Sequence, residues 1–205
     1  MYRVRVLDRA CVKSGLHKSV CVKQNIEWIY TISMNEAPIK IVNLWEFKHM
    51  DLSDYPFAIS IREAGETKIP RPDYNGERLN LAFYDSVEGP GIATADDIRA
   101  VHAFTSEWMS ALYSEPKGSL VIHCFAGVSR SSAIALVPLL AYYQLRVSEY
   151  ELTAAKRLFD VNRWAEPNMH IVYLIEESYR LNGELFAALE EAKVSKFHLL
   201  PQELT

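Results

Sequence analysis

The sequence has few cysteines and no long apolar segment, and these absences exclude several classes of protein. Its 205 residues include three cysteines, Cys11, Cys21 and Cys124, and no Cys-x-x-Cys pair. An odd number of cysteines without a Cys-x-x-Cys pair excludes a disulfide framework and a zinc ribbon. No apolar run approaches the roughly 18 residues of a membrane span, and the first residues, MYRVRVLDRA, do not form a signal peptide. We therefore expect a cytoplasmic protein with no membrane segment.

The chain also lacks a large excess of charge of either sign. Lys and Arg total 22 and Asp and Glu total 26, so the net charge is −4 at pH 7. This balance excludes the broad positive surface with which proteins hold nucleic acid or anionic lipid, so we expect no nucleic-acid groove and only a local anion site. The chain is 49% hydrophobic and 23% charged, which is typical of a soluble globular protein. Its length favours a single domain over residues 1–205.

Short apolar runs typical of strands precede residue 90, and a helical period begins after residue 93. The expected strands before residue 90 are Tyr2–Leu7, Ile26–Ile32, Ile39–Leu44, Phe57–Ile61 and Leu79–Tyr84, and a further, buried strand is expected later, at Ser119–His123. Five helices are expected. The first follows a capping box at Thr94 and Asp97, and the second spans Ser131–Leu145. The other three run from a cap at Ser148 to about Phe159, from Pro167 to Leu181, and over Glu184–Lys193. Strands followed by covering helices predict an α/β fold with a central, mostly parallel sheet flanked by helices.

The segment VIHCFAGVSRSSAIAL is the most informative part of the sequence. Its strand ends at His123, a helix begins at Arg130, and a short loop lies between them. Such a loop points several backbone N–H groups at one position, where the helix dipole adds positive charge. Gly127 permits a backbone angle or a close approach that a side chain would block. The pattern predicts a loop that binds a tetrahedral oxyanion, formed by Phe125, Ala126, Gly127, Val128, Ser129 and Arg130.

The side chains that flank this loop suit nucleophilic chemistry on a bound phosphate. A helix N-terminus and a nearby cation favour the thiolate of a cysteine, so we expect Cys124 to be ionised and directed at phosphorus. Arg130 offers a planar fork that can hold two phosphoryl oxygens. Ser131 can donate its hydroxyl to the sulfur and so make it a better leaving group. Together these residues predict a cysteine nucleophile, a transition-state cation and a hydroxyl that assists the second step.

The segment His-Cys-x-x-x-x-x-Arg-Ser resembles the signature of the cysteine-dependent protein tyrosine phosphatases. Its Gly-x-Ser-Arg-Ser portion is most similar to the dual-specificity group and to small bacterial tyrosine-phosphatase-like proteins. Leu79–Asp85 resembles the family strand that ends in the general acid, and Arg163 with Glu166-Pro167-Asn168 resembles a late Arg…Pro-Asn element. The resemblance covers residues 77–191 well; residues 1–60 match only as generic strands, and residues 192–205 form an unmatched C-terminal tail.

The resemblance implies a two-step mechanism that needs neither a metal nor a cofactor. Cys124 attacks phosphorus while Asp85 protonates the leaving oxygen, and water then hydrolyses the cysteinyl-phosphate with Asp85 as base. Arg130 and the loop N–H groups stabilise the phosphoryl oxygens in both steps. His123 is expected to orient the loop, and Asn168 is expected to be a structural residue close to it.

Two assignments keep alternatives at this stage. Glu88, Asp96 and Asp97 are rivals of Asp85 for the general acid, although Asp96 and Asp97 also suit a helix start for structural reasons. A group of cations in the irregular stretch 62–80 is either solvated or forms a rim that contacts an acidic phosphopeptide. This group comprises Arg62, Lys68, Arg71 and Arg78.

The expected function is that of a protein phosphatase acting on phosphotyrosine or on phosphoserine and phosphothreonine in a protein or peptide. One alternative is a non-protein substrate: an inositol phosphate, a phosphoinositide or an RNA 5′-phosphate. The loop carries no lysine for such highly charged head groups, which disfavours that alternative. A phosphate-binding pseudophosphatase is also disfavoured, because the cysteine, the arginine and the acid are all present. The sequence gives no indication of oligomeric state.

Overall fold

The computed structural model describes residues 36–114 and 118–198, without the side chains of the last two. All of these residues belong to one compact unit. The strands expected at Tyr2–Leu7 and Ile26–Ile32 lie outside the described residues, as do Cys11 and Cys21. The arrangement of residues 1–205 as a single domain therefore stays a prediction.

A parallel four-stranded sheet forms the centre of the fold. Its strands are β1 (Ile39–Asn43), β2 (Phe57–Arg62), β3 (Glu77–Ala82) and β4 (Leu120–Cys124), in the spatial order β1-β4-β2-β3. All three pairings are parallel. Every residue of the inner strand β4 is buried, as expected for a parallel strand covered on both faces. The α/β fold class and the central parallel sheet are thus confirmed.

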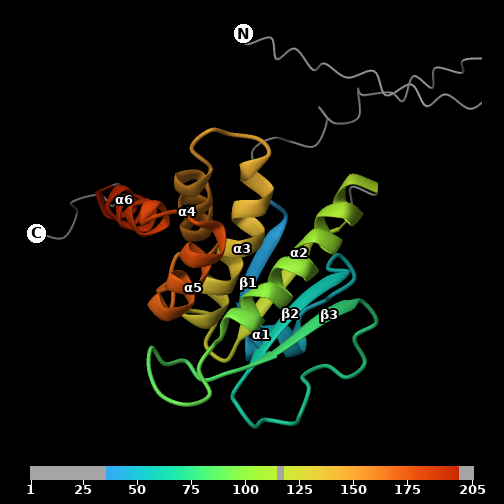
Figure 1. The fold of residues 1–205 in the computed structure, drawn as a ribbon. Coiled ribbons are helices and arrows are strands. Elements are labelled where there is room, and N and C mark those ends of the chain that lie inside the picture. The colour runs from blue at the N-terminus through green and yellow to red at the C-terminus, as the bar shows by residue number, and fades with distance from the viewer. Residues whose placement is uncertain (1–35, 115–117, 199–205) are drawn as a thin grey trace, which may run out of the picture. The chain divides into compact units, whose positions relative to one another are not determined.

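Six helices accompany the sheet in the described residues, as Figure 1 shows: α1 (Leu44–His49), α2 (Ala95–Ser114), α3 (Arg130–Gln144), α4 (Tyr150–Val161), α5 (Met169–Tyr179) and α6 (Glu184–His198). Helix α1 contributes Phe47 to a small apolar cluster with Val42, Ala58 and Val121 on one face of the sheet. The larger core lies on the other face, where α2 and α3 pack. The two clusters bury alternate residues of the strands, so the sheet is covered on both faces.

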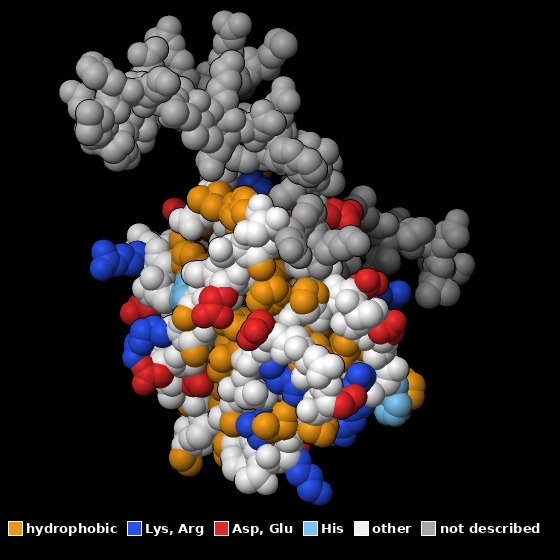
Figure 2. Space-filling view, turned by 90° about the vertical axis from the view of Figure 1, so that its right-hand side faces the viewer, with side chains coloured by type: hydrophobic (Ala, Val, Ile, Leu, Met, Phe, Trp, Pro, Cys, Tyr) orange, Lys and Arg blue, Asp and Glu red, His pale blue; other side chains and the backbone are white. Residues whose placement is uncertain are grey.

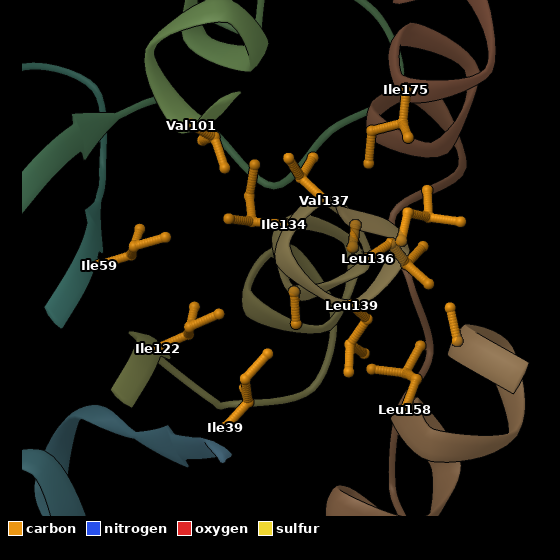
Figure 3. Close-up of a cluster of buried hydrophobic side chains, with 14 of the residues drawn as sticks. Ile39, Ile59, Val101, Ile122, Ile134, Leu136, Val137, Leu139, Leu158 and Ile175 are labelled. Atoms are coloured by element: carbon orange, nitrogen blue, oxygen red, sulfur yellow. The ribbon is translucent and has the colours of Figure 1, made fainter. Parts of the chain in front are cut away.

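Helix α3 is the centre of the larger core. In Figure 3 its side chains Ile134, Leu136, Val137 and Leu139 point outward in several directions, toward residues of the strands and of the neighbouring helices. These neighbours include Ile59, Ile122, Val101, Leu158 and Ile175. A helix that is apolar on every side must be buried on every side. This burial fixes the position of the N-terminus of α3, where the predicted anion loop ends.

Of three helix starts predicted from local sequence patterns, one was confirmed and two were wrong. The capping box is present, because the Asp97 carboxylate accepts from the backbone N–H of Thr94 at 2.8 Å. Ser148 does not cap α4, which begins at Tyr150 after a residue whose side chain makes no capping bond. Pro167 is not the first residue of α5, because the next residue, Asn168, is the N-cap. Helix α4 therefore begins one residue later than the local pattern indicates, and α5 begins two residues later.

Candidate active site

The predicted anion loop lies between β4 and α3 at the carboxyl end of the sheet. Because β4 is an inner strand, the loop emerges between β1 and β2, where parallel sheets commonly bind ligands. Gly127 has a φ of +74°, and a Cβ atom there would lie 2.7 Å from the Asn43 nitrogen and 2.8 Å from the Val42 carbonyl carbon. Both reasons for a glycine at this position therefore hold. The loop backbone packs directly on the end of β1.

Cys124 lies at the base of the loop with two groups close to its sulfur. The backbone N–H of Gly127 donates to Sγ at 3.2 Å, and the Ser131 Oγ lies 3.2 Å from the same sulfur. Cys124 is 1% exposed and Ser131 is fully buried. The structure thus places the predicted nucleophile and its neighbouring hydroxyl in direct contact, at the N-terminus of α3.

Arg130 is buried beside the loop and is held by groups from two other strand ends. Its Nη1 donates to the carbonyls of Phe83 at 2.9 Å and Arg62 at 3.3 Å, and its Nη2 donates to Glu63 Oε1 at 2.6 Å. The Nε–H is buried and has no hydrogen-bond partner among the described residues. The guanidinium is therefore fixed in position: both Nη atoms bond protein groups, and the Nε–H is left without an acceptor.

Asp85 follows β3 and contacts the loop directly. Its Oδ1 accepts from Ser129 Oγ at 2.8 Å and from Asn168 Nδ2 at 2.9 Å, and its Oδ2 lies 3.8 Å from Arg130 Nε. Two of its three rivals are engaged elsewhere, because Asp97 caps α2 and Asp96 pairs with Arg99. The third, Glu88, is exposed in the connection between β3 and α2, and its side chain bonds none of the described site residues. The structure thus brings Asp85, and neither of these two aspartates, to the predicted site.

His123 supports the loop from beneath. It is fully buried, its Nε2 shares a 2.7 Å hydrogen bond with Ser60 Oγ, and its ring stacks on Phe47 with centroids 4.0 Å apart. Burial lowers the pKa of His123 to about 4, and the charges of Arg78 and Lys48 act in the same direction. The imidazole is therefore neutral at neutral pH. This environment suits the orienting role that the sequence predicts.

Asn168 links α5 to the site. Its Oδ1 accepts from the backbone N–H groups of His170 and Ile171, which caps the helix, while its Nδ2 donates to Asp85. One amide side chain therefore fixes the start of α5 and the orientation of the predicted acid together.

Sequence reasoning missed three side chains that hold this arrangement. Asn162 Nδ2 donates to the Gly127 carbonyl at 2.8 Å and to Ser132 Oγ at 2.9 Å. Glu63 pairs with Arg130, and Ser60 bonds His123. Asn162 directly precedes the Arg163 of the matched late element, which is the nearest signal for it. Glu63 and Ser60 carry no local signal, because their partners lie more than 60 residues away in sequence.

Three of the four cations in the stretch 62–80, predicted to be either solvated or part of a rim, are bound to backbone carbonyls. Arg78 donates to the carbonyls of Pro70 and Arg71, Arg71 donates to that of Met50, and Arg62 donates to that of Glu66. They hold the segment between β2 and β3 in place. On the face shown in Figure 2, basic, acidic and hydrophobic side chains are interspersed.

Among the described residues, no group of three His, Cys, Asp or Glu side chains is arranged to hold a metal ion. None of the described helices is long and apolar enough to span a membrane.

Comparison with known proteins identifies the fold. No family model matches the chain, and no curated protein matches its sequence. The solved structure of DUSP15 is 17% identical with a TM-score of 0.51, and the match covers 78% of this chain and 90% of that one. The PTP-2 phosphatase of Cydia pomonella is 20% identical with a TM-score of 0.51, covering 70% of this chain and 86% of that one. The resemblance to the cysteine-dependent phosphatases is thereby confirmed for the fold, which this chain shares with them.

Proposed function

We propose that this chain is a cysteine-dependent phosphomonoesterase. The observation that carries the proposal is the grouping of Cys124, Ser131 and Arg130 around one short loop at a helix N-terminus. The sulfur lies 3.2 Å from both a backbone donor and the Ser131 hydroxyl. The Nε–H of Arg130 is a buried donor without an acceptor, and a bound phosphoryl oxygen would accept its hydrogen bond. The shared fold supports the same conclusion.

In the first step, the Cys124 thiolate attacks phosphorus in line with the leaving oxygen. The S–P bond forms, the P–O bond to the leaving group breaks, and Asp85 gives its proton to the departing oxygen. Charge on the three equatorial oxygens is stabilised by the loop N–H groups and by Arg130. Asp85 is suitably held for this step because Ser129 and Asn168 both bond its Oδ1.

In the second step, water replaces the sulfur. Asp85, now a carboxylate, takes a proton from the water, a new P–O bond forms, and the S–P bond breaks. The Ser131 hydroxyl is within hydrogen-bond distance of the sulfur and stabilises it as it leaves. Inorganic phosphate is released, and the thiolate and the protonated acid are restored.

We further propose a phosphorylated protein or peptide as the substrate, at phosphotyrosine or at phosphoserine and phosphothreonine. The loop side chains Phe125, Ala126, Val128 and Ser129 carry no positive charge, which disfavours a polyphosphorylated inositol or lipid head group. A phosphate-binding protein without turnover is disfavoured, because the cysteine, the arginine and Asp85 are all present, with Asp85 Oδ2 3.8 Å from Arg130 Nε.

Hydrolysis of an activated aryl phosphate tests the proposal. Cys124→Ser is expected to abolish turnover while retaining inorganic phosphate binding, because the hydroxyl is nearly isosteric but does not ionise. Arg130→Lys is expected to lower turnover severely, since a lysine ammonium cannot keep the bonds to the Phe83 carbonyl and to Glu63 and also present a donor to the phosphate. Arg99→Lys, at an exposed arginine paired with Asp96 at the start of α2, is the matched control and should keep wild-type turnover. Wild-type rates in either site variant would overturn the proposed mechanism.

A further inference from the structure

Three large aromatic side chains near the loop are unusually exposed. Trp45 and Phe125 are each 70% exposed and Trp164 is 67% exposed. By contrast, Trp108, Phe47 and Phe83 are exposed by 1% or less, and the most exposed tyrosines among the described residues reach only 45–52%. Exposed aromatic residues that gather at one place mark an interaction site rather than a random surface. Their common location therefore decides whether they have a role.

A backbone hydrogen bond joins the segments that carry two of these aromatic residues. Phe125 directly follows Cys124 in the loop, and its carbonyl accepts from the backbone N–H of Leu44 at 3.1 Å. Trp45 follows Leu44 in the first turn of α1, which Figure 1 shows at the end of the sheet. The two exposed rings therefore extend from adjoining segments at the carboxyl end of β1 and β4.

The third aromatic residue reaches the same loop from the connection between α4 and α5. The Asn162 side chain donates to the Gly127 carbonyl at 2.8 Å, and the backbone N–H of Glu166 donates to the Val128 carbonyl at 3.1 Å. Trp164 lies midway between these two anchors. Three separate elements thus place an exposed aromatic residue around the one anion loop.

The charges around the loop restrict what can lie against these rings. Glu63 and Asp85, whose side chains are 46% and 36% exposed, face the buried guanidinium, and Glu166 is exposed beside the loop. The arginines between β2 and β3 are bound to backbone carbonyls. One phosphate can be neutralised by the loop and Arg130, whereas further negative charge would meet these carboxylates. One exposed cation, Arg163, stands against these three carboxylates, and its guanidinium lies 4.6 Å from the centre of the Trp164 ring. The balance of charge still disfavours strongly acidic peptides and anionic lipid surfaces.

We propose that Trp45, Phe125 and Trp164 form an aromatic rim that binds aromatic or aliphatic side chains flanking the phosphorylated residue of a peptide. This inference rests on the proposed function and defines its substrate class. The phosphate enters the loop, and the neighbouring apolar residues of the peptide cover the exposed rings. Contacts of this kind strengthen binding through both buried apolar area and ring geometry.

The test compares kcat/KM for matched substrates, each expressed relative to the free phosphoamino acid, which has no flanking residues. The substrates are a phosphopeptide with Phe and Leu flanks, a phosphopeptide of the same length with Glu flanks, and vesicles that contain a phosphatidylinositol phosphate. The peptides are made with phosphotyrosine and with phosphothreonine. The wild-type chain should favour the apolar flanks in whichever series it hydrolyses.

The rim variants Trp45→Ala and Trp164→Ala should each lower the relative kcat/KM for the apolar peptide by about 3- to 10-fold, mainly through KM. The matched controls are Leu145→Ala, 70% exposed after the far end of α3, and Tyr113→Ala, 50% exposed near the end of α2. Neither should change that ratio, because neither residue adjoins the loop.

If the kcat/KM for the apolar peptide, relative to the free phosphoamino acid, is the same in the wild type and in the rim variants, the aromatic rim is overturned and the phosphatase proposal stays intact. A preference for the Glu-flanked peptide, or for the vesicles, would also overturn the rim, the latter in favour of a lipid surface. A chain that hydrolyses no phosphomonoester would overturn the proposed function, and the rim with it.

Discussion

Replacing Gly127 with alanine is a direct test of how the loop is held against β1. The residue has a φ of +74°, and an added Cβ would lie 2.7 Å from the Asn43 nitrogen, 2.8 Å from the Val42 carbonyl carbon and 2.9 Å from the Val42 oxygen. These are backbone atoms of a sheet strand, so no side-chain rotation can relieve the contact. Either β1 or the loop must move.

The expected loss of stability has two parts. The left-handed conformation costs a non-glycine residue about 1–2 kcal/mol. Overpacking against fixed atoms costs about 1–3 kcal/mol more. Gly127→Ala should therefore lower the free energy of unfolding by about 2–5 kcal/mol. Activity should fall as well, because a displaced loop loses the 3.2 Å contact between the Gly127 N–H and the Cys124 sulfur.

Urea unfolding of the full chain measures this loss, with Gly183→Ala as the matched control. Gly183 has a φ of +95° but no atom within 4 Å of its added Cβ, so only the conformational part applies there. The control should lose about 1–2 kcal/mol and keep its turnover. Equal losses in the two variants, or wild-type hydrolysis by Gly127→Ala, would show that the loop does not depend on this close packing.

Three further outcomes follow from buried or hydrogen-bonded side chains. Burial lowers the pKa of His123 from 6.5 to about 4, so between these pH values the unfolded chain binds a proton that the folded chain does not. The free energy of unfolding should therefore fall by up to about 3 kcal/mol as the pH is lowered from 6.5 toward 4. His123→Gln should flatten that part of the stability profile measured by urea unfolding; an unchanged slope would contradict the assignment. The buried Glu176 carboxylate accepts three backbone N–H groups at the start of α6, so Glu176→Ala should lower the unfolding free energy by about 1–3 kcal/mol in thermal melts without loss of turnover. Asp85→Asn should slow hydrolysis of substrates with poor leaving groups by roughly 10²–10⁴, and less for an activated aryl phosphate, in steady-state assays. Asp97→Asn should cost only about 0.5–2 kcal/mol of stability, because a helix cap is lost. Slower hydrolysis by Asp97→Asn together with unchanged hydrolysis by Asp85→Asn would show that Asp85 is not the general acid.

The loop could be predicted from the sequence because all of its parts are contiguous. A buried strand, a cysteine, a glycine and an arginine that opens a helix occupy one short segment, so spacing alone specifies their relation. Asp85 and Asn168 needed the family resemblance, since they lie far apart in the sequence and meet only when α5 packs beside the end of β3.

Other features depend on contacts that no local pattern records. Glu63 looks like one of several charges in an irregular stretch until the fold brings it to Arg130. Helix α1 was not predicted because it has only six residues, too few to show a clear period. The cap expected at Ser148 was wrong because α4 begins at Tyr150. The Glu149 carbonyl accepts from both the backbone N–H and the Oγ1 of Thr153, so the first helical bonds form one residue after Ser148.

The central claim is that catalysis passes through a phosphate bound to the sulfur of Cys124. Ser131→Ala should slow the second step, because the hydroxyl 3.2 Å from the sulfur no longer assists its departure. The measurement is acid quenching of this variant and of the wild type during turnover of an activated aryl phosphate, followed by digestion and mass spectrometry. A phosphate adduct on the peptide that contains Cys124, more abundant in Ser131→Ala, is the expected result. Sustained turnover with no adduct on Cys124, or with the phosphate on another residue, would contradict the account.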